Sequence, residues 1–151
     1  MALTTTTHLN FAGTAREALA LYRDVFGGDV RVTTYGELGM PQDAPDAAKV
    51  VFGQLETAGG LRLMAYDVPG SGEPARGSAR RENGLTLTDQ PFFVSVRAES
   101  LDEAASCWEG LADGATVVEP LAASAWSAGF GMLTDRFGVT WVIDVAPPAA
   151  G

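Results

Sequence analysis

The stretch Thr14-Ala-Arg-Glu-Ala-Leu-Ala-Leu-Tyr-Arg-Asp-Val-Phe-Gly-Gly28 has a counterpart 86 positions later, Ser100-Leu-Asp-Glu-Ala-Ala-Ser-Cys-Trp-Glu-Gly-Leu-Ala-Asp-Gly114. Each begins with a capping box, in which a Thr or Ser side chain accepts from a first-turn amide and a Glu three residues later reaches back. Each continues with apolar residues at helical spacing and ends at a glycine that can close a helix. The constant offset of these independent features predicts a duplicated module.

Segments rich in β-branched and aromatic residues flank both predicted helices. We expect strands at residues 7–11, 30–35, 49–57 and 61–67 of the first module, and at 91–98, 116–118, 131–134 and 139–145 of the second. Each module is therefore βαβββ. The sequence predicts a single α+β domain over residues 1–151, with modules at about 4–68 and 88–147 and an exposed Gly- and Pro-rich linker at about 69–87.

Composition narrows the classes of partner. The formal net charge of −9 would repel phosphate backbones and anionic lipid, so nucleic acid and membranes are not expected partners. No apolar run approaches the roughly 18 residues of a membrane helix, and the first residues lack the pattern of a secretion signal. We expect a cytoplasmic protein. The single cysteine, Cys107, excludes an internal disulfide and is interpreted as a packing residue.

Three segments carry a resemblance to a known family. They are Leu9-Asn-Phe-Ala-Gly-Thr-Ala-Arg-Glu-Ala18, Leu21-Tyr-Arg-Asp-Val-Phe-Gly-Gly28 and Trp126-Ser-Ala-Gly-Phe-Gly-Met-Leu-Thr-Asp-Arg-Phe-Gly-Val-Thr-Trp141. With the tandem βαβββ pattern, the chain resembles the vicinal oxygen chelate superfamily, which includes glyoxalase I, bleomycin-resistance proteins and extradiol dioxygenases, and within it the PhnB-like branch. The resemblance implies an open, cup-shaped mixed sheet of eight strands with helices on its outer face, completed by a homodimer partner.

In metal-using members of that superfamily, four His or Glu ligands hold one divalent ion. The resemblance places the four positions at His8 and near Met64, Pro91 and Val142, so only His8 is a ligand type. The usual His-Ala-Glu of the third strand is replaced here by Phe52-Gly-Gln54. We therefore expect no bound metal; a rearranged site that combines His8 with Asp144 is the alternative. Without metal, His8 would be a hydrogen-bonded strand histidine that lines the cavity.

Strand alternation predicts which side chains line the cavity. The expected ligand-binding residues are His8, Asn10, Phe52, Gln54, Met64, Tyr66, Trp126, Phe130 and Asp144. Trp126 is interpreted as a pocket wall or dimer contact, with plain core packing as the alternative. Trp141 is expected to pack beneath the sheet. The family's arginine before the Phe-Gly pair is Gly129 here, so the obvious anion clamp is missing. No catalytic residue can be assigned from the sequence.

Three functions remain open at this point. The first is a PhnB-like, glyoxalase/bleomycin-resistance-type protein that binds a small apolar or aromatic molecule in the cup without the usual metal tetrad. The second is a metal-dependent lyase, isomerase or dioxygenase with a rearranged site. The third is a dimeric scaffold without a small ligand.

Overall fold

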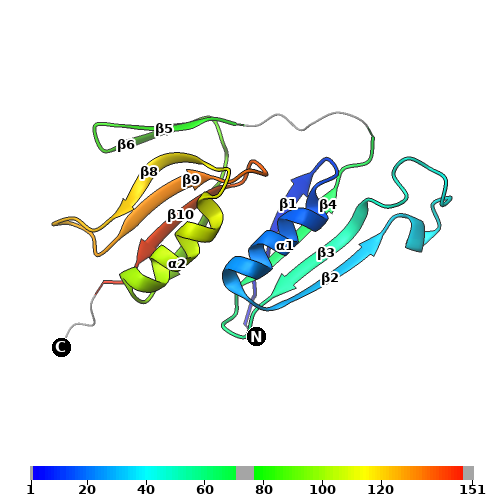
Figure 1. Ribbon diagram of the computed structural model, residues 1–151, viewed down its shortest axis with the longest axis horizontal. Coiled ribbons are helices and arrows are strands. Elements are labelled where there is room, and N and C mark those ends of the chain that lie inside the picture. Colours follow the sequence, from blue (N-terminus) through cyan, green and yellow to red (C-terminus); the bar gives the residue numbers. More distant parts are fainter. Residues whose placement is uncertain (1, 71–76, 148–151) are drawn as a thin grey trace. The chain divides into compact units, whose positions relative to one another are not determined.

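The computed structural model describes residues 2–70 and 77–147 (Figure 1). Internal contacts divide the chain into two compact units, residues 1–75 and 76–151, and each has its own sheet and its own helix. Across the described part, neither helix has the length and hydrophobicity needed to cross a membrane.

The first unit is a βαβββ module with one additional short helix. Along the chain it contains β1 (Thr7–Phe11), α1 (Ala15–Phe26), β2 (Asp29–Thr34), η1 (Gly36–Leu38), β3 (Val50–Glu56) and β4 (Arg62–Asp67). The sheet order is β1-β4-β3-β2. The first strand pairs with β4 in parallel, and the other two pairings are antiparallel. A parallel pair needs a long crossover, which here includes α1.

The second unit repeats this topology. It contains β7 (Val94–Ala98), α2 (Leu101–Ala112), β8 (Thr116–Ala122), β9 (Phe130–Thr134) and β10 (Thr140–Val145), in the sheet order β7-β10-β9-β8. Its β7 and β10 are parallel, and the others are antiparallel. Strand β8 is longer than its expected range, and β7 begins later. The α+β class and the two βαβββ modules are thus confirmed, and their eight strands form two open four-stranded sheets.

The repeat does not keep one offset along its whole length. The helices lie 86 positions apart, but the turns before the last strands match at 78. In the first turn, Thr57 Oγ1 accepts from the backbone N–H of Leu61 at 3.1 Å, and in the second Asp135 Oδ1 accepts from Val139 at 3.1 Å. The offset changes because the connection between the second and third strands of the module differs in length. It covers residues 35–49 in the first unit and only 123–129 in the second.

The two predicted capping boxes have different outcomes. Ser100 Oγ accepts from the backbone N–H of Glu103 at 3.1 Å, as expected. Thr14 makes no side-chain capping bond, so that part of the prediction is wrong. Its place is taken by Asp67 at the end of β4, whose Oδ1 accepts from Gly13 at 2.8 Å and from Ala15 at 3.0 Å. The Asp67 carboxylate therefore satisfies the amide of Ala15, the first residue of α1, and that of Gly13 just before the helix.

The helix ends also differ in detail from the prediction. Helix α1 is closed by Gly27, at φ 79°, whose N–H donates to the carbonyl of Arg23 at 2.7 Å; Gly28, the expected residue, follows at φ 94°. Gly114, at φ 73°, lies beyond the end of α2 as expected. Glycine is favoured at such positive φ values because it has no Cβ.

Part of the expected linker is an ordered hairpin. Residues 71–76 of the linker lie outside the described part, but β5 (Ala79–Glu82) and β6 (Leu85–Thr88) pair antiparallel. The turn between them is Asn83-Gly84, with φ 51° and 78°. Two successive positive φ values are the requirement of a type I′ turn, which Asn-Gly meets. The prediction of an exposed linker over residues 69–87 missed this hairpin, because it rested on the Gly and Pro content of the whole segment and not on the Asn-Gly pair.

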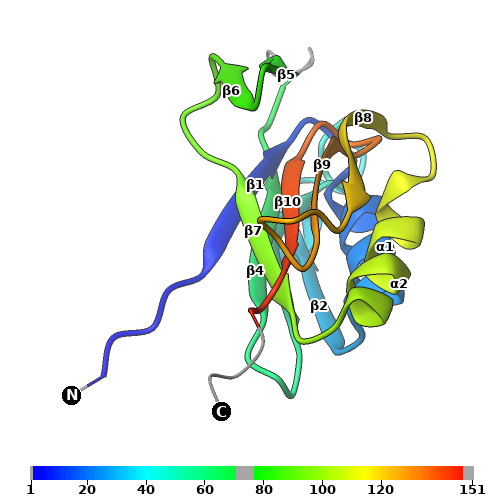
Figure 2. The ribbon, with the colours of Figure 1, turned by 90° about the vertical axis from the view of Figure 1, so that its left-hand side faces the viewer.

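In each unit the helix covers one face of the sheet (Figure 2). The other face carries the half-buried and exposed side chains. Two glycines permit the close approach. A Cβ on Gly53 of β3 would lie 2.6 Å from Leu19 of α1, and a Cβ on Gly131 of β9 would lie 2.7 Å from Trp108 of α2. The two glycines occupy the same position in the repeat. Trp141 is fully buried, as expected, and its indole N–H donates to Asp135 at 2.9 Å.

Candidate functional site

The sheet face that α1 leaves open brings together the predicted residues of the first unit. Burial alternates along β1, β3 and β4, so Leu9, Leu55 and Leu63 point to the core. The side chains on the opposite face are those of His8, Asn10, Phe52, Gln54, Met64 and Tyr66. Strand register places His8 beside Met64, Asn10 beside Tyr66 and Gln54 beside Met64. We call this surface the first open face. The predicted sharing of faces is confirmed; ligand binding there stays a prediction.

Aromatic groups supply much of the first open face. The rings of His8 and Tyr66 meet edge to face, with centroids 5.3 Å apart and planes at 90°. This is a favourable geometry for the aromatic quadrupole. Phe52, on the central strand β3, exposes 42% of its surface. Next to it along β3, the Gln54 amide donates to the Glu56 carboxylate. The face therefore offers apolar contact area with polar groups around it.

The corresponding face of the second unit carries Phe130 and Asp144 from the predicted set. The two residues are directly opposite each other in the β9–β10 pair. Asp144 is held by Arg97 of β7, with Nη2 donating to Oδ2 at 2.9 Å, and this hydrogen bond raises the pKa of the Arg97 guanidinium. Arg81 of β5 lies over the Phe130 ring, 5.0 Å from its centroid. We call this surface the second open face. Sequence reasoning missed both arginines.

Trp126 lies apart from these strands. It is 96% exposed in the segment before β9, so the core alternative is wrong. Its backbone N–H donates to Ser124 Oγ at 3.2 Å, and Ser124 N–H donates to the Ser127 carbonyl at 2.8 Å. A hydrogen-bonded turn thus presents the indole to solvent. Pocket wall and dimer contact both stay open for this residue.

The donor set does not fit the family's metal tetrad. Of the two positions in the first unit, His8 has imidazole nitrogens but its neighbour Met64 has only a thioether. In the second unit the topological match of His8 is Ser95, which pairs with Val142. Pro91, near which the third ligand position was expected, precedes β7. Nowhere in residues 2–70 and 77–147 do three His, Cys, Asp or Glu side chains gather closely enough to hold a metal ion.

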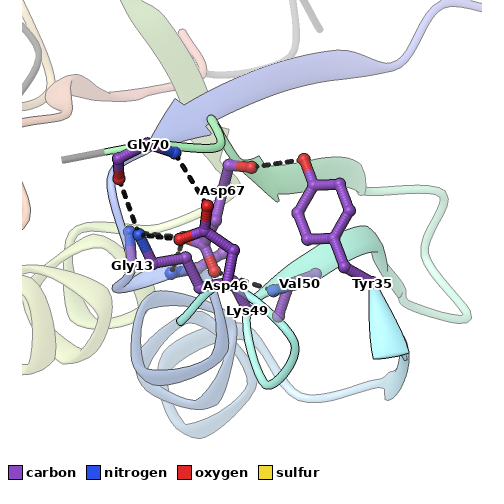
Figure 3. A network of polar contacts seen from close by, with 8 residues as sticks. Gly13, Tyr35, Asp46, Lys49, Val50, Asp67 and Gly70 are labelled. Atoms are coloured by element: carbon purple, nitrogen blue, oxygen red, sulfur yellow. Dashed lines mark hydrogen bonds and ion pairs between the residues drawn. The ribbon is translucent and has the colours of Figure 1, made fainter. Parts of the chain in front are cut away.

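Asp67, at the end of β4, has a structural role (Figure 3). It is 1% exposed, and its second oxygen accepts from the backbone N–H of Val50 at 2.9 Å. Its backbone carbonyl accepts from the Tyr35 hydroxyl at 2.7 Å. Burial, followed by the charges of nearby groups that include Asp67, raises the pKa of Tyr35 above its usual 10.0. The hydrogen bonds of Asp67 join α1, β3 and β4.

A second cluster extends this network to the end of β4 (Figure 3). Lys49 Nζ lies 2.7 Å from the Asp46 carboxylate and donates to the Gly70 carbonyl at 2.9 Å, while Gly70 N–H donates to Asp46 at 3.0 Å. The hydrogen bond from Lys49 is the main reason why the pKa of Asp46 is lowered from 3.8. These contacts hold the connection between β2 and β3, residues 35–49, against the segment that follows β4.

The environment of Cys107 does not activate its thiol as a nucleophile. Cys107 is half-buried on α2, and burial, with a smaller contribution from Glu103, raises the pKa of its thiol. A raised pKa reduces the thiolate fraction, which is the reactive form. The packing interpretation of Cys107 agrees with this environment.

Comparison with known proteins agrees with the fold. The sequence model of the Glyoxalase/Bleomycin resistance protein/Dioxygenase superfamily matches residues 7–143. Protein YjdN of Escherichia coli K12 is 28% identical over 145 residues, covering 91% of this chain and 92% of YjdN.

Solved structures show the same likeness. Protein PA1353 from Pseudomonas aeruginosa superposes with a TM-score of 0.72 at 29% identity, covering 95% of this chain and 98% of that one. A putative 3-demethylubiquinone-9 3-methyltransferase, PhnB protein, from Bacillus cereus superposes with a TM-score of 0.70 at 23% identity, covering 95% and 100%, and shares the fold. The family match spans nearly the whole chain, both βαβββ modules included, and the chain belongs to the Glyoxalase/Bleomycin resistance protein/Dioxygenase superfamily, with PhnB-like proteins among its structural neighbours.

Proposed function

We propose that this protein binds a small, uncharged aromatic or apolar molecule on the first open face, without a metal ion. The observation that carries the proposal is the exposed Phe52 ring on the same face as the His8–Tyr66 ring pair. A ligand that covers the Phe52 ring would remove this apolar surface from water, which is favourable.

The chemistry of the face suits such a ligand. An aromatic guest gains roughly 0.5–1.5 kcal/mol per favourable ring pair beyond the area that it buries. The side-chain amides of Asn10 and Gln54 are suited to hydrogen bonds with polar substituents, which fix the orientation of a ligand. The side-chain donors described above do not match the family's metal ligands, so the proposal contains no metal-assisted step.

The test uses N-phenyl-1-naphthylamine, a neutral aromatic probe whose fluorescence rises when it leaves water. We expect saturable binding to the full chain. Phe52→Ala and Tyr66→Ala should each raise the dissociation constant by about tenfold, the equivalent of roughly 1.4 kcal/mol. The matched control is Phe92→Ala, which removes a ring that is 57% exposed and lies outside the strands. Equal weakening by all three changes, or no saturable binding, would reject the proposal.

A second candidate is contact between two copies of the chain through Trp126. It rests on the presentation of this indole by a hydrogen-bonded turn at 96% exposure. Tryptophan is enriched in interfaces because it combines a large apolar surface with one donor. Sedimentation of the wild type and Trp126→Ala tests it: a dimer that dissociates in the variant, with probe affinity unchanged, supports this candidate. A wild type that sediments as a monomer, or an unchanged dimer in the variant, excludes it.

A further inference from the structure

The hairpin β5–β6 holds its two adjacent arginines in different environments. Arg81 and its cross-strand partner Thr86 are half-buried on one side of the hairpin, whereas Arg80 is exposed on the other. The Arg80 side chain is 67% exposed and bonds Glu82 along its own strand, while the Arg81 side chain is only 22% exposed. The hairpin therefore places Arg81 on the second open face, over Phe130.

The guanidinium of Arg81 is incompletely bonded for its burial. Nη1 donates to Thr86 Oγ1 at 2.7 Å. Nε is buried and, among the residues that the structure describes, has no hydrogen-bond partner. The nearest carboxylate oxygen, Oε2 of Glu119, is 4.0 Å from Nε, too far for a hydrogen bond. A buried charged donor without an acceptor is destabilising, and an arginine fork best fits a bidentate oxyanion.

Arg97 on this face has a carboxylate partner at 2.9 Å, whereas the carboxylate nearest to Arg81 Nε is 4.0 Å away. Asp144, opposite Phe130 in the strand register, is already bonded by Arg97 through Nε and Nη2. The Phe130 ring lies under the Arg81 guanidinium. Glu119 opposes an incoming anion, but its side chain is 42% exposed and makes only a loose ion pair with Arg81, so it can turn into solvent.

We propose that Arg81 forms a carboxylate-binding site on the second open face, with the ligand carboxylate beside Nε in the place that Glu119 approaches and the ligand's apolar body against Phe130. The ligand class is a small aromatic or aliphatic monocarboxylic acid. Arg81, Phe130 and Glu119 all belong to the second unit, and the proposal does not depend on the function proposed for the first open face.

The experiment follows the Nε–H signal of Arg81 in ¹⁵N-labelled full-length protein during titration with benzoate. We expect a saturable shift with benzoate, at least tenfold weaker binding of acetate and inorganic phosphate, and none of benzyl alcohol, which has the ring without the charge. Phosphate binding as tight as benzoate would overturn the role of the apolar body.

Three variants separate a binding role from a structural one. Arg81→Lys keeps the charge but loses the forked guanidinium, so the dissociation constant of benzoate, measured by calorimetry, should rise at least tenfold. Arg80→Lys, on the exposed side of the same hairpin, should leave it unchanged. Glu119→Gln should strengthen it severalfold, because the competing carboxylate is removed. Equal losses in both arginine variants, or weaker binding in Glu119→Gln, would overturn the proposal. Binding of the neutral probe to the first open face should be the same in all three.

Discussion

The Asp67 side chain binds the backbone of two separate segments of the first unit. Its carboxylate accepts from Gly13, Ala15 and Val50, and it is 1% exposed. Its capping role was not predictable, because the residues that it bonds lie 17 to 54 positions away.

Asp67→Asn should therefore destabilise the protein strongly. The substitution puts an NH₂ group against backbone donors that need an acceptor, and we expect a loss of about 3 kcal/mol in the free energy of unfolding. Urea denaturation followed by circular dichroism measures it. Asp24→Asn, on the exposed side of α1, should change the value by less than about 0.5 kcal/mol. Similar losses in both would contradict the assigned role.

Thr14 and Ser100 make a matched pair, because both were predicted to cap and only Ser100 does. Ser100→Ala should lower the free energy of unfolding by about 1 kcal/mol, the usual effect of losing a cap. Thr14→Ala should change it by less than about 0.5 kcal/mol. The same denaturation experiment decides it, and a larger loss at Thr14 would show that its hydroxyl caps the helix in solution.

Asp46 should make stability depend on pH. Because its pKa is lowered in the folded state from 3.8, the carboxylate stabilises the fold above that value, and the contribution is lost as the pH falls through the folded pKa. Asp46→Asn should be less stable than the wild type at pH 7, and the difference should shrink below about pH 4. Asp43→Asn, exposed in the same connection, serves as the control. A difference that persists unchanged at pH 3 would contradict this origin.

At the scale of elements, the close packing of helix on sheet depends on Gly53 and Gly131. Alanine at either position would meet atoms at 2.6 to 2.9 Å. We expect each Gly→Ala change to destabilise the protein by about 1–3 kcal/mol through overpacking. Gly59→Ala, whose Cβ would have only an ordinary contact at 4.0 Å, should lie within about 0.5 kcal/mol of the wild type. Neutral substitutions at both strand glycines would contradict this account.

The types of the secondary-structure elements were well predicted where the hydrophobic pattern of a segment was regular over its length. Both helices and all eight module strands follow from capping, alternation and β-branched runs. The β5–β6 hairpin was missed, although Asn83-Gly84 carries its signal, because the surrounding residues are typical of a linker. The contact of Arg81 with Phe130 was missed for the same reason, because residues of an exposed linker are not expected to contact a strand of the second unit.

At the scale of the whole molecule, duplication explains the two units but not their chemistry. Both modules keep the same strand order. The side chains on their open faces differ: His8 beside Met64 in the first unit corresponds to Ser95 beside Val142 in the second. The sequence predicted which residues of the first open face lie together, because alternation fixes the face of a strand. It did not predict hydrogen bonds or ion pairs between distant strands, which depend on register.

The central claim is that ligand binding on the first open face needs no metal ion. The most direct measurement titrates N-phenyl-1-naphthylamine into full-length protein after chelator treatment, and again after addition of Zn²⁺, Ni²⁺, Mn²⁺ or Fe²⁺, with the metal content of each sample determined. The proposal predicts saturable binding with the same dissociation constant in every sample. Binding that disappears with the chelator and returns with about one equivalent of one metal would contradict it.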